Sequence, residues 1–252
     1  QFISPSDIDL WQSRQLARVC QATVVRQRAT LSSILNTAQR DGLLPFNPCT
    51  RSIRPRVPER DIRYLTKEEI VQVLSGAGHI REWLEDYILW CLLSGMRQCE
   101  VRNLRWGNVI TSPSGSLYVQ FKTGKTYKQR SVACSPEMER IIARQRNRKV
   151  EGDDRVFPVA KITITRAWSA LRKATGLPSI TLQSLRTTCA TLGVGGGVPS
   201  RIIGSMLGHT GGDDMLVRHY AGRIESAEMQ AAITIQDMVL GTGTCQIISR
   251  PS

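Results

Sequence analysis

Residues 84–100 read LEDYILWCLLSGMRQCE, and they say more about the fold than any other stretch of the chain. The first ten are mostly apolar, and helical spacing relates Leu84, Tyr87, Ile88, Cys91 and Leu92. A helix that is apolar around most of its circumference is usually buried, so we predict a buried central helix. Ser94-Gly95 should end it, and a second helix should begin near Arg97.

Three helices are predicted before this stretch. The first has Ser6 or Asp7 as its cap. The second runs from about residue 22 to residue 40, and Gly42 suits the position just beyond its end. Thr66-Lys67-Glu68-Glu69 is a capping box that opens the third helix.

Prolines divide the chain after the second helix. Because proline stops helices, its frequency from residue 45 onward favours an extended linker centred on residues 50–63. We therefore predict a helical domain at residues 1–56, a linker at 57–63 and a second domain at 64–252. The linker region contains Arg51, Arg54, Arg56, Arg60 and Arg63. These arginines could follow a phosphate backbone or simply be solvated, and the sequence leaves both interpretations open.

Beyond residue 100 the pattern changes to a β-hairpin and then returns to helices. Leu117, Val119 and Phe121 alternate as in a strand, residues 122–125 form a turn, and residues 131–133 return. Ser135 before Pro136 begins a helix to about residue 149. Later helices are predicted at 163–175, 182–193, 199–207, 214–220 and 224–239. The predicted fold class is mainly α with a small β-hairpin, an α+β arrangement.

The chain is strongly basic. Its 252 residues contain 34 Lys and Arg against 21 Asp and Glu, which gives a net charge of +13 and a pI near 9.9. The first 63 residues hold ten Arg and no Lys, and Arg suits phosphate because its planar fork bonds two oxygens at once. This balance favours a nucleic-acid partner, although a basic surface without a specific partner would have the same composition.

Cysteine usage and hydropathy argue against several classes of protein. The seven cysteines form no C-x-x-C pair and none lies at zinc spacing from a histidine, so we expect neither a disulfide framework nor a metal site. This usage fits a reducing cytosol. No signal peptide or membrane-spanning apolar run is recognisable. The chain begins at Gln1 rather than Met, which we interpret as a fragment or a processed form.

Two arginines and a lysine are candidates for holding or protonating a phosphate group. Arg97 lies at a predicted helix start, where backbone N–H groups suit an anion, and Glu100 one turn later can orient its guanidinium. Arg186 lies in an otherwise apolar helix and calls for an anionic partner. Lys122, at the hairpin turn, can donate a proton to a leaving alkoxide. Taken singly, a surface arginine and a solvated hairpin tip are the simpler explanations.

A tyrosine near the C-terminus completes the pattern. Leu207-Gly208-His209 is followed eleven residues later by Tyr220. A Tyr hydroxyl has a pKa of about 10 and is a poor nucleophile until it is activated. Its attack on a phosphodiester builds negative charge, which arginines and a histidine can neutralise. A lone Tyr or His is usually structural, so it is the order of these residues that points to chemistry.

In that order the chain resembles the tyrosine recombinase (phage integrase) family. Members carry Leu-x-x-Gly-x-Arg on a helix, a hairpin Lys, His-x-x-Arg, Leu-Gly-His and a nucleophilic Tyr. Residues 92–106 are similar to the first motif, and residues 40–48 look like the end of the family's helical core-binding domain. The resemblance implies a tetramer on double-stranded DNA, with a partial core-binding domain at 1–56 and the catalytic domain at 64–252.

The resemblance also implies a role for each matching residue. Arg97, Arg186 and His209 would hold the scissile phosphate. Tyr220 would form a 3′-phosphotyrosyl bond, and Lys122 would protonate the departing 5′-oxygen. No metal, ATP or other cofactor is implied. Lys125 joins the linker arginines as an expected DNA contact, and the helix at 224–239 with its tail resembles the segment that docks onto a neighbouring protomer.

The chain departs from the family's pattern at two places. Gln183 stands where the family usually has His, and Gln can bond a phosphate but carries no charge and shuttles no proton. Tyr220 follows His209 by eleven residues rather than the usual nine, an excess that a loop at residues 211–214 could absorb. His219 is then either a surface residue or a partial replacement for the missing histidine.

We therefore expect a site-specific DNA recombinase or integrase that serves a phage or another mobile element. Two alternatives stay open. An enzyme like the type IB topoisomerases would relax DNA supercoils by the same chemistry without exchanging strands. A non-catalytic DNA-binding relative would bind with a steep salt dependence and form no covalent adduct.

Overall fold

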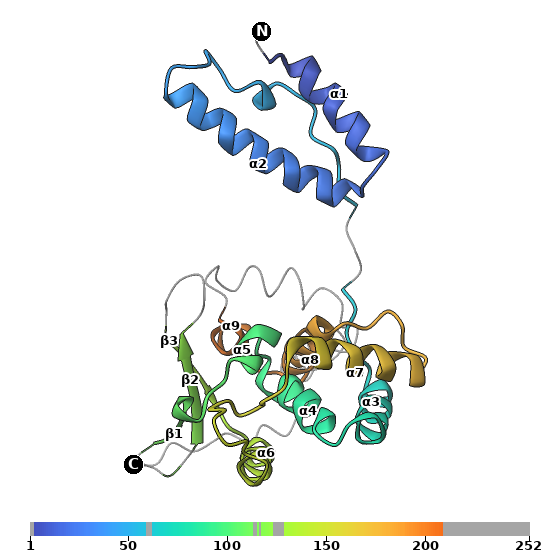
Figure 1. The fold of residues 1–252 in the computed structure, drawn as a ribbon, viewed down its shortest axis with the longest axis vertical. Coiled ribbons are helices and arrows are strands. Elements are labelled where there is room, and N and C mark those ends of the chain that lie inside the picture. Colours follow the sequence, from blue (N-terminus) through green and yellow to red (C-terminus); the bar gives the residue numbers. More distant parts are fainter. Residues whose placement is uncertain (1–2, 59–61, 113–114, 116, 123–128, 209–252) are drawn as a thin grey trace, which may run out of the picture. The chain divides into compact units, whose positions relative to one another are not determined.

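The computed structural model describes residues 3–58, 62–112, 115, 117–122 and 129–208 (Figure 1). These residues form two compact units, one that ends before residue 59 and one that begins at residue 62. The helices predicted at 214–220 and 224–239 lie outside the described residues. Of the helices that are described, none is long and apolar enough to cross a membrane.

The first unit is a pair of helices closed by a short turn. Its elements are α1 (Pro5–Leu16), α2 (Gln21–Arg40) and the 3-10 helix η1 (Pro48–Thr50). Ile8, Leu35 and Cys49 form its buried centre. Arg28 of α2 donates to the Ser52 hydroxyl at 3.0 Å and to the Cys49 carbonyl. These bonds hold the segment after η1 against α2.

The ends of these two helices follow local sequence signals. Ser4, rather than the predicted Ser6 or Asp7, caps α1. The reason is that Pro5 fits the first helical position, while the Asp7 carboxylate accepts from the Ser4 backbone N–H at 2.8 Å and completes a capping box. Gly42 has a φ of +75° just beyond α2, as its predicted position requires.

Helices make up most of the second unit, as predicted. They are α3 (Lys67–Ile80), α4 (Leu84–Ser94), α5 (Gln98–Arg102), η2 (Trp106–Asn108), α6 (Pro136–Asn147), α7 (Lys161–Ala174), α8 (Leu182–Gly195) and α9 (Ser200–Leu207). The predicted capping box is present at α3, where the Glu69 backbone N–H donates to the Thr66 hydroxyl at 3.2 Å. Ser135 caps α6 ahead of Pro136, again as predicted.

A small antiparallel sheet lies beside the helices. Its order is β1-β2-β3, with β1 (Val109–Thr111), β2 (Leu117–Lys122) and β3 (Gln129–Ala133). The predicted hairpin is β2–β3, in which Phe121 pairs with Arg130 and Lys122 pairs with Gln129. The sequence does not predict β1, because three residues are too few to show an alternating pattern. The fold is therefore mainly α with one small sheet.

Helix α4 is the centre of this unit, as its apolar sequence predicts. It packs against α3, α6 and α8, and Figure 1 shows α4 and α8 in the middle of the helical part. Leu84, Tyr87, Ile88 and Trp90 are fully buried. The Phe157 ring meets the Tyr87 and Trp90 rings at centroid distances of 5.5 and 5.9 Å. The C-terminal end of α4 is therefore held firmly in place.

A glycine turn links α4 to α5. Gly95 has a φ of +58°, a conformation that favours glycine. An added Cβ would lie 2.5 Å from Leu207 Cδ2 and 3.1 Å from Cys189 Sγ. Helices α8 and α9 thus pack directly against this turn, which fixes where Arg97 begins α5.

Candidate active site

Arg97 and Glu100 form one side of the candidate site, at the start of α5. The Glu100 carboxylate accepts from the Arg97 backbone N–H at 2.8 Å and from its Nη1 at 3.1 Å. The Glu100 side chain is 8% exposed, whereas the Arg97 side chain is 41% exposed. The contact that the sequence suggests is therefore present, and it leaves the Arg97 guanidinium accessible from outside.

A second arginine binds the same carboxylate, and sequence analysis does not single it out. Arg130 of β3 donates from Nη1 to Glu100 at 3.2 Å, and its side chain is 5% exposed. Its guanidinium lies 5.1 Å from the centre of the Phe121 ring. Burial lowers the pKa of Arg130, a shift that the Glu100 charge opposes and the Arg97 charge reinforces. One carboxylate thus serves two guanidinium groups, and this group of three keeps a positive charge.

Arg186 lies on α8 and joins the ends of two other helices. It is 2% exposed. Its Nη1 donates to the Gly95 carbonyl at 2.6 Å and its Nη2 donates to the Leu207 carbonyl at 2.7 Å. Both acceptors lie at helix C-termini, where carbonyl groups lack partners within the helix and carry the negative end of the helix dipole. The sequence predicts an anionic partner for Arg186, and these two partners are partially negative carbonyls.

Cys189 shows that the two sides of the site meet. Its thiol lies against the Gly95 turn. Burial raises the pKa of Cys189 to about 11, and the positive charges of Arg186 and Arg130 oppose that shift. Arg186 donates to the Leu207 carbonyl, and the next residue, Gly208, lies against Arg130, so the two arginines meet at the end of α9. We call Arg97, Glu100, Arg130 and Arg186 the arginine cluster.

Two further candidates lie near this cluster, one on α8 itself and one on β2, the strand that pairs with the strand of Arg130. Gln183 is exposed on α8, three positions before Arg186, and so leaves the helix on the same side. Lys122 is the last residue of β2, opposite Gln129. The residue before it, Phe121, lies opposite Arg130 in the strand pairing, and its ring contacts the Arg130 guanidinium.

The catalytic candidates His209 and Tyr220, and the possible supporting residue His219, lie outside the described residues. The residue before His209 is described. Gly208 ends α9 with a φ of +68°, and an added Cβ there would lie 2.9 Å from Cδ of Arg130. The chain therefore leaves α9 directly against the arginine cluster.

The candidate DNA contacts fall into three groups. Exposed in the first unit are Arg51, Arg54 and Arg56. Outside the described residues lie Arg60 and Lys125. Arg63 belongs to the second unit, where it pairs with Glu69 and donates from Nε to the Ser179 hydroxyl at 3.3 Å. Arg63 thus has hydrogen-bond and ion-pair partners within the protein. Arg51, although exposed, lies over the Phe46 ring, 4.6 Å from its centre.

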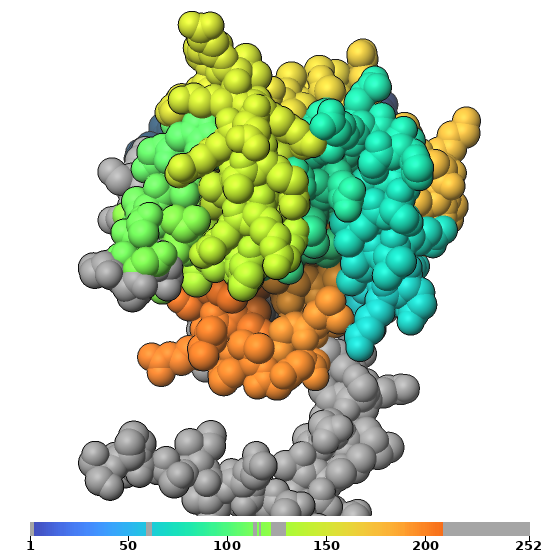
Figure 2. Space-filling view, turned by 90° about the horizontal axis from the view of Figure 1, so that it is seen from below, coloured from blue at the N-terminus to red at the C-terminus, as the bar shows by residue number. Residues whose placement is uncertain are grey.

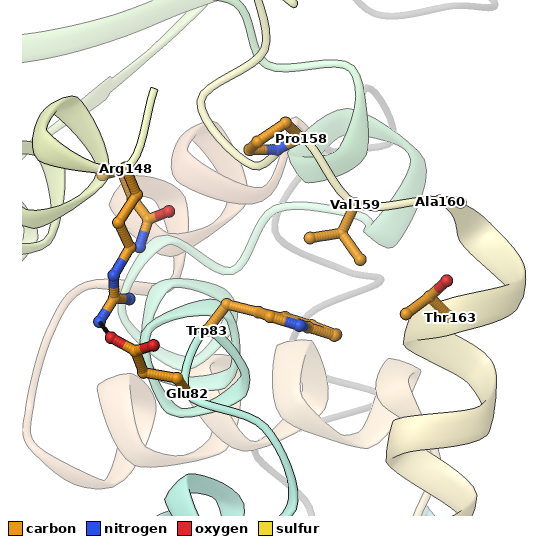
Figure 3. Close-up of a pocket in the computed structure, with 8 residues that line it drawn as sticks. Glu82, Trp83, Arg148, Pro158, Val159, Ala160 and Thr163 are labelled. Atoms are coloured by element: carbon orange, nitrogen blue, oxygen red, sulfur yellow. Dashed lines mark hydrogen bonds and ion pairs between the residues drawn. The ribbon is translucent and has the colours of Figure 1, made fainter. Parts of the chain in front are cut away.

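A pocket of about 380 Å³ lies between the start of α4, α6 and residues 158–160. Figure 3 shows the Trp83 ring on one side of it and Arg148 bonded to Glu82, at 2.6 Å. Arg148 also donates to Asp86 at 3.2 Å. None of the candidate residues lines this pocket, and its arginine already has carboxylate partners, so it is separate from the candidate site.

A more apolar groove of about 570 Å³ lies between residues 64–67 and residues 191–196. Figure 2 shows the second unit from below, with orange residues from the C-terminal part of the described chain next to cyan residues from the start of this unit. No candidate residue lines the groove. Within the described ranges, no three His, Cys, Asp or Glu side chains gather as metal ligands would. The arginine cluster is therefore the feature that marks the candidate site.

Comparison with known proteins relates the second unit to one family. The pattern of the phage integrase family matches residues 63–224, a range that includes the whole arginine cluster. A Haemophilus influenzae protein assigned to the integrases/recombinases is 24% identical over 192 residues, which cover 72% of this chain and 52% of that protein. The chain thus spans about half the length of this relative.

Two solved structures have a similar fold. The lambda integrase dimer bound to a COC′ core site has a TM-score of 0.73 and 20% identity, over 88% of this chain and 81% of that one. The Tn1549 transposon integrase in complex with circular intermediate DNA has a TM-score of 0.72 and 15% identity, over 91% and 85% of the two chains. At these identities the likeness establishes the fold.

Proposed function

Because the chain belongs to the phage integrase family, we propose that it is a site-specific tyrosine recombinase, which cuts and rejoins DNA through a 3′-phosphotyrosyl intermediate. The observation that supports this best is the arginine cluster beside the Gly95 turn. Guanidinium groups donate paired hydrogen bonds to phosphate oxygens, and positive charge held in a buried setting suits a phosphodiester.

In the proposed reaction, the Tyr220 hydroxyl loses its proton to water as its oxygen attacks the scissile phosphate, and a 5′-oxygen leaves. Arg97 and Arg186, with His209, offset the negative charge that builds on the phosphate oxygens. Lys122 gives the departing oxygen its proton. A 5′-hydroxyl of a partner strand then attacks the phosphotyrosyl bond and releases the tyrosine. Since that bond conserves the phosphodiester energy, no ATP is required, and the arginines supply the charge that a metal would otherwise supply.

Double-stranded DNA is the proposed partner, and a tetramer on paired sites is the proposed assembly. The net charge of +13 and the exposed Arg51, Arg54 and Arg56 support contact with phosphates. We assign residues 1–56 to part of a core-binding domain, 57–63 to a linker and 64–252 to the catalytic domain. The role that we propose, on the resemblance to the phage integrase family, is integration of a mobile element.

This function can be tested on a supercoiled plasmid. The plasmid carries two copies of the DNA sequence that the protein selects in a binding experiment. We expect recombinant circles from the native chain. In Tyr220→Phe we expect no recombinants and unchanged DNA binding, because the nucleophile is gone while the phosphate contacts remain.

The same assay separates the two alternatives. Relaxed parental circles without recombinants would contradict strand exchange and favour an activity like that of the type IB topoisomerases. Salt-sensitive binding that leaves the plasmid unchanged would favour a non-catalytic DNA-binding protein.

A further inference from the structure

Arg130 lies where three segments of the second unit meet. It pairs across the hairpin with Phe121. Its Nη1 reaches Glu100 on α5, 30 positions away in the sequence. Its Cδ lies so close to Gly208 that an added Cβ there would be 2.9 Å away. Residues of the proposed reaction are near these contacts in the sequence. Lys122 follows Phe121, His209 follows Gly208, and Arg97 precedes Glu100 by three positions.

Among the described residues, Arg130 supplies the ion pair that ties Glu100 to a distant part of the fold. Its bonds to Arg97 are local, because they join residues three positions apart. Among the described residues, the bond from Arg130 is the long-range one that the Glu100 carboxylate accepts. Without it, the carboxylate and the Arg97 guanidinium could turn together. Arg130 is itself held, since it is buried and lies over the Phe121 ring.

Stability is a weak explanation for Arg130. Its Nε and Nη2 have no hydrogen-bond partner within the described part of the chain, so much of its donor capacity is buried unused. Replacement of a buried ion pair by well-packed apolar residues is often neutral or stabilising. A charged pair at this place therefore calls for a reason other than cohesion of the fold.

We propose that Arg130 is a positioning residue, which holds Glu100 and through it directs the Arg97 guanidinium at the scissile phosphate. This inference rests on the proposed function. Arg97 is the member of this group that can meet DNA, because its side chain is 41% exposed while that of Arg130 is 5% exposed. Arg130 acts on the reaction only through Arg97. Removing Arg130 should therefore matter little once Arg97 is impaired.

Single-turnover cleavage at saturating DNA measures this dependence. Arg130→Met should slow cleavage about 100-fold, the range expected for a misplaced oxyanion donor. Arg130→Lys should slow it about tenfold, because an ammonium keeps the charge but loses the planar fork. In an Arg97→Lys background, Arg130→Met should slow cleavage less than about threefold, since the two changes remove one function. Equal slowing in both backgrounds, or none in the native background, overturns the proposal.

Arg144→Met is the matched control. Arg144 on α6 donates to the buried Asp86 carboxylate at 2.7 and 2.9 Å, so its loss also leaves a buried acid with fewer partners. We expect Arg144→Met to lower the thermal midpoint as Arg130→Met does while the cleavage rate stays native. Slowing of cleavage by both variants in proportion to their lost stability would overturn a positioning role.

A spectroscopic measurement decides the question without any catalysis. In nitrogen-15-labelled protein, the Nε–H signal of Arg97 is identified by its loss in Arg97→Lys. That signal should move toward the position of a free arginine in Arg130→Met and stay in place in Arg144→Met. An Arg97 signal unchanged by Arg130→Met overturns the proposal even if the native protein cleaves DNA. If the signal moves but the native protein cleaves no DNA, the proposed function fails and the positioning contact stands.

Discussion

Arg186→Met is expected to lower the rate of DNA cleavage by at least about 1000-fold. On the proposed function, it removes a guanidinium that stabilises charge on the phosphate. It also leaves the Gly95 and Leu207 carbonyls without the donor that each now has. An unpaired buried carbonyl costs about 1–3 kcal/mol, so the free energy of unfolding should fall as well. Single-turnover cleavage and denaturant unfolding measure the two effects separately.

Arg172 supplies the control for this experiment. Its Nη1 also donates to two backbone carbonyls, those of Pro178 at 3.0 Å and Ile180 at 3.4 Å, but it lies on α7 outside the arginine cluster. Arg172→Met should lower stability and leave the cleavage rate of the folded protein unchanged. If both variants slowed cleavage alike, Arg186 would have a structural role and no part in the chemistry.

Gly95→Ala should be strongly destabilising and should also reduce cleavage. The native φ of +58° disfavours any residue with a Cβ, at a cost of about 1–2 kcal/mol. The new methyl would lie 2.5 Å from Leu207 Cδ2, and overpacking of this kind typically adds about 1–3 kcal/mol. Relief of the clash must move the turn whose carbonyl binds Arg186. Thermal unfolding and cleavage at a temperature where the variant is folded measure the two losses.

Gly176→Ala separates the cost of the left-handed backbone conformation from the cost of the steric clash. Gly176 has a φ of +66°, and an added Cβ there would have no neighbour within 4 Å. It should show the conformational cost alone and native cleavage. Equal destabilisation by the two substitutions would mean that the close packing of α8 and α9 on the Gly95 turn contributes little.

Much of the fold follows from signals that are local in the sequence. The capping box at Thr66 and the Ser135-Pro136 cap place two helix starts, because each satisfies backbone N–H groups within one turn. The position of Gly95 follows from the end of an apolar run. The prediction of Ser6 or Asp7 as the cap of α1 is wrong, because Pro5 takes the first helical position and leaves Ser4 as the cap.

The partners within the site depend on long-range packing. The contact between Glu100 and Arg97 can be predicted, because it spans less than one helical turn. The contact of Arg130 with Glu100 cannot, because it requires the hairpin register and the placement of β3 beside α5. Two partners of Arg186 are the backbone carbonyls of Gly95 and Leu207, and backbone groups carry no signature in the side-chain sequence. An arginine in an apolar helix predicts that a partner exists, but it does not identify that partner.

The most direct test of the central claim is a covalent adduct on a suicide duplex. A labelled duplex of the selected DNA site, nicked so that the cleaved end is lost, is incubated with the protein and then denatured. We predict a protein–DNA adduct that survives denaturation and is absent from Tyr220→Phe. Tight binding without an adduct, or an adduct that persists in Tyr220→Phe, would contradict the phosphotyrosyl mechanism.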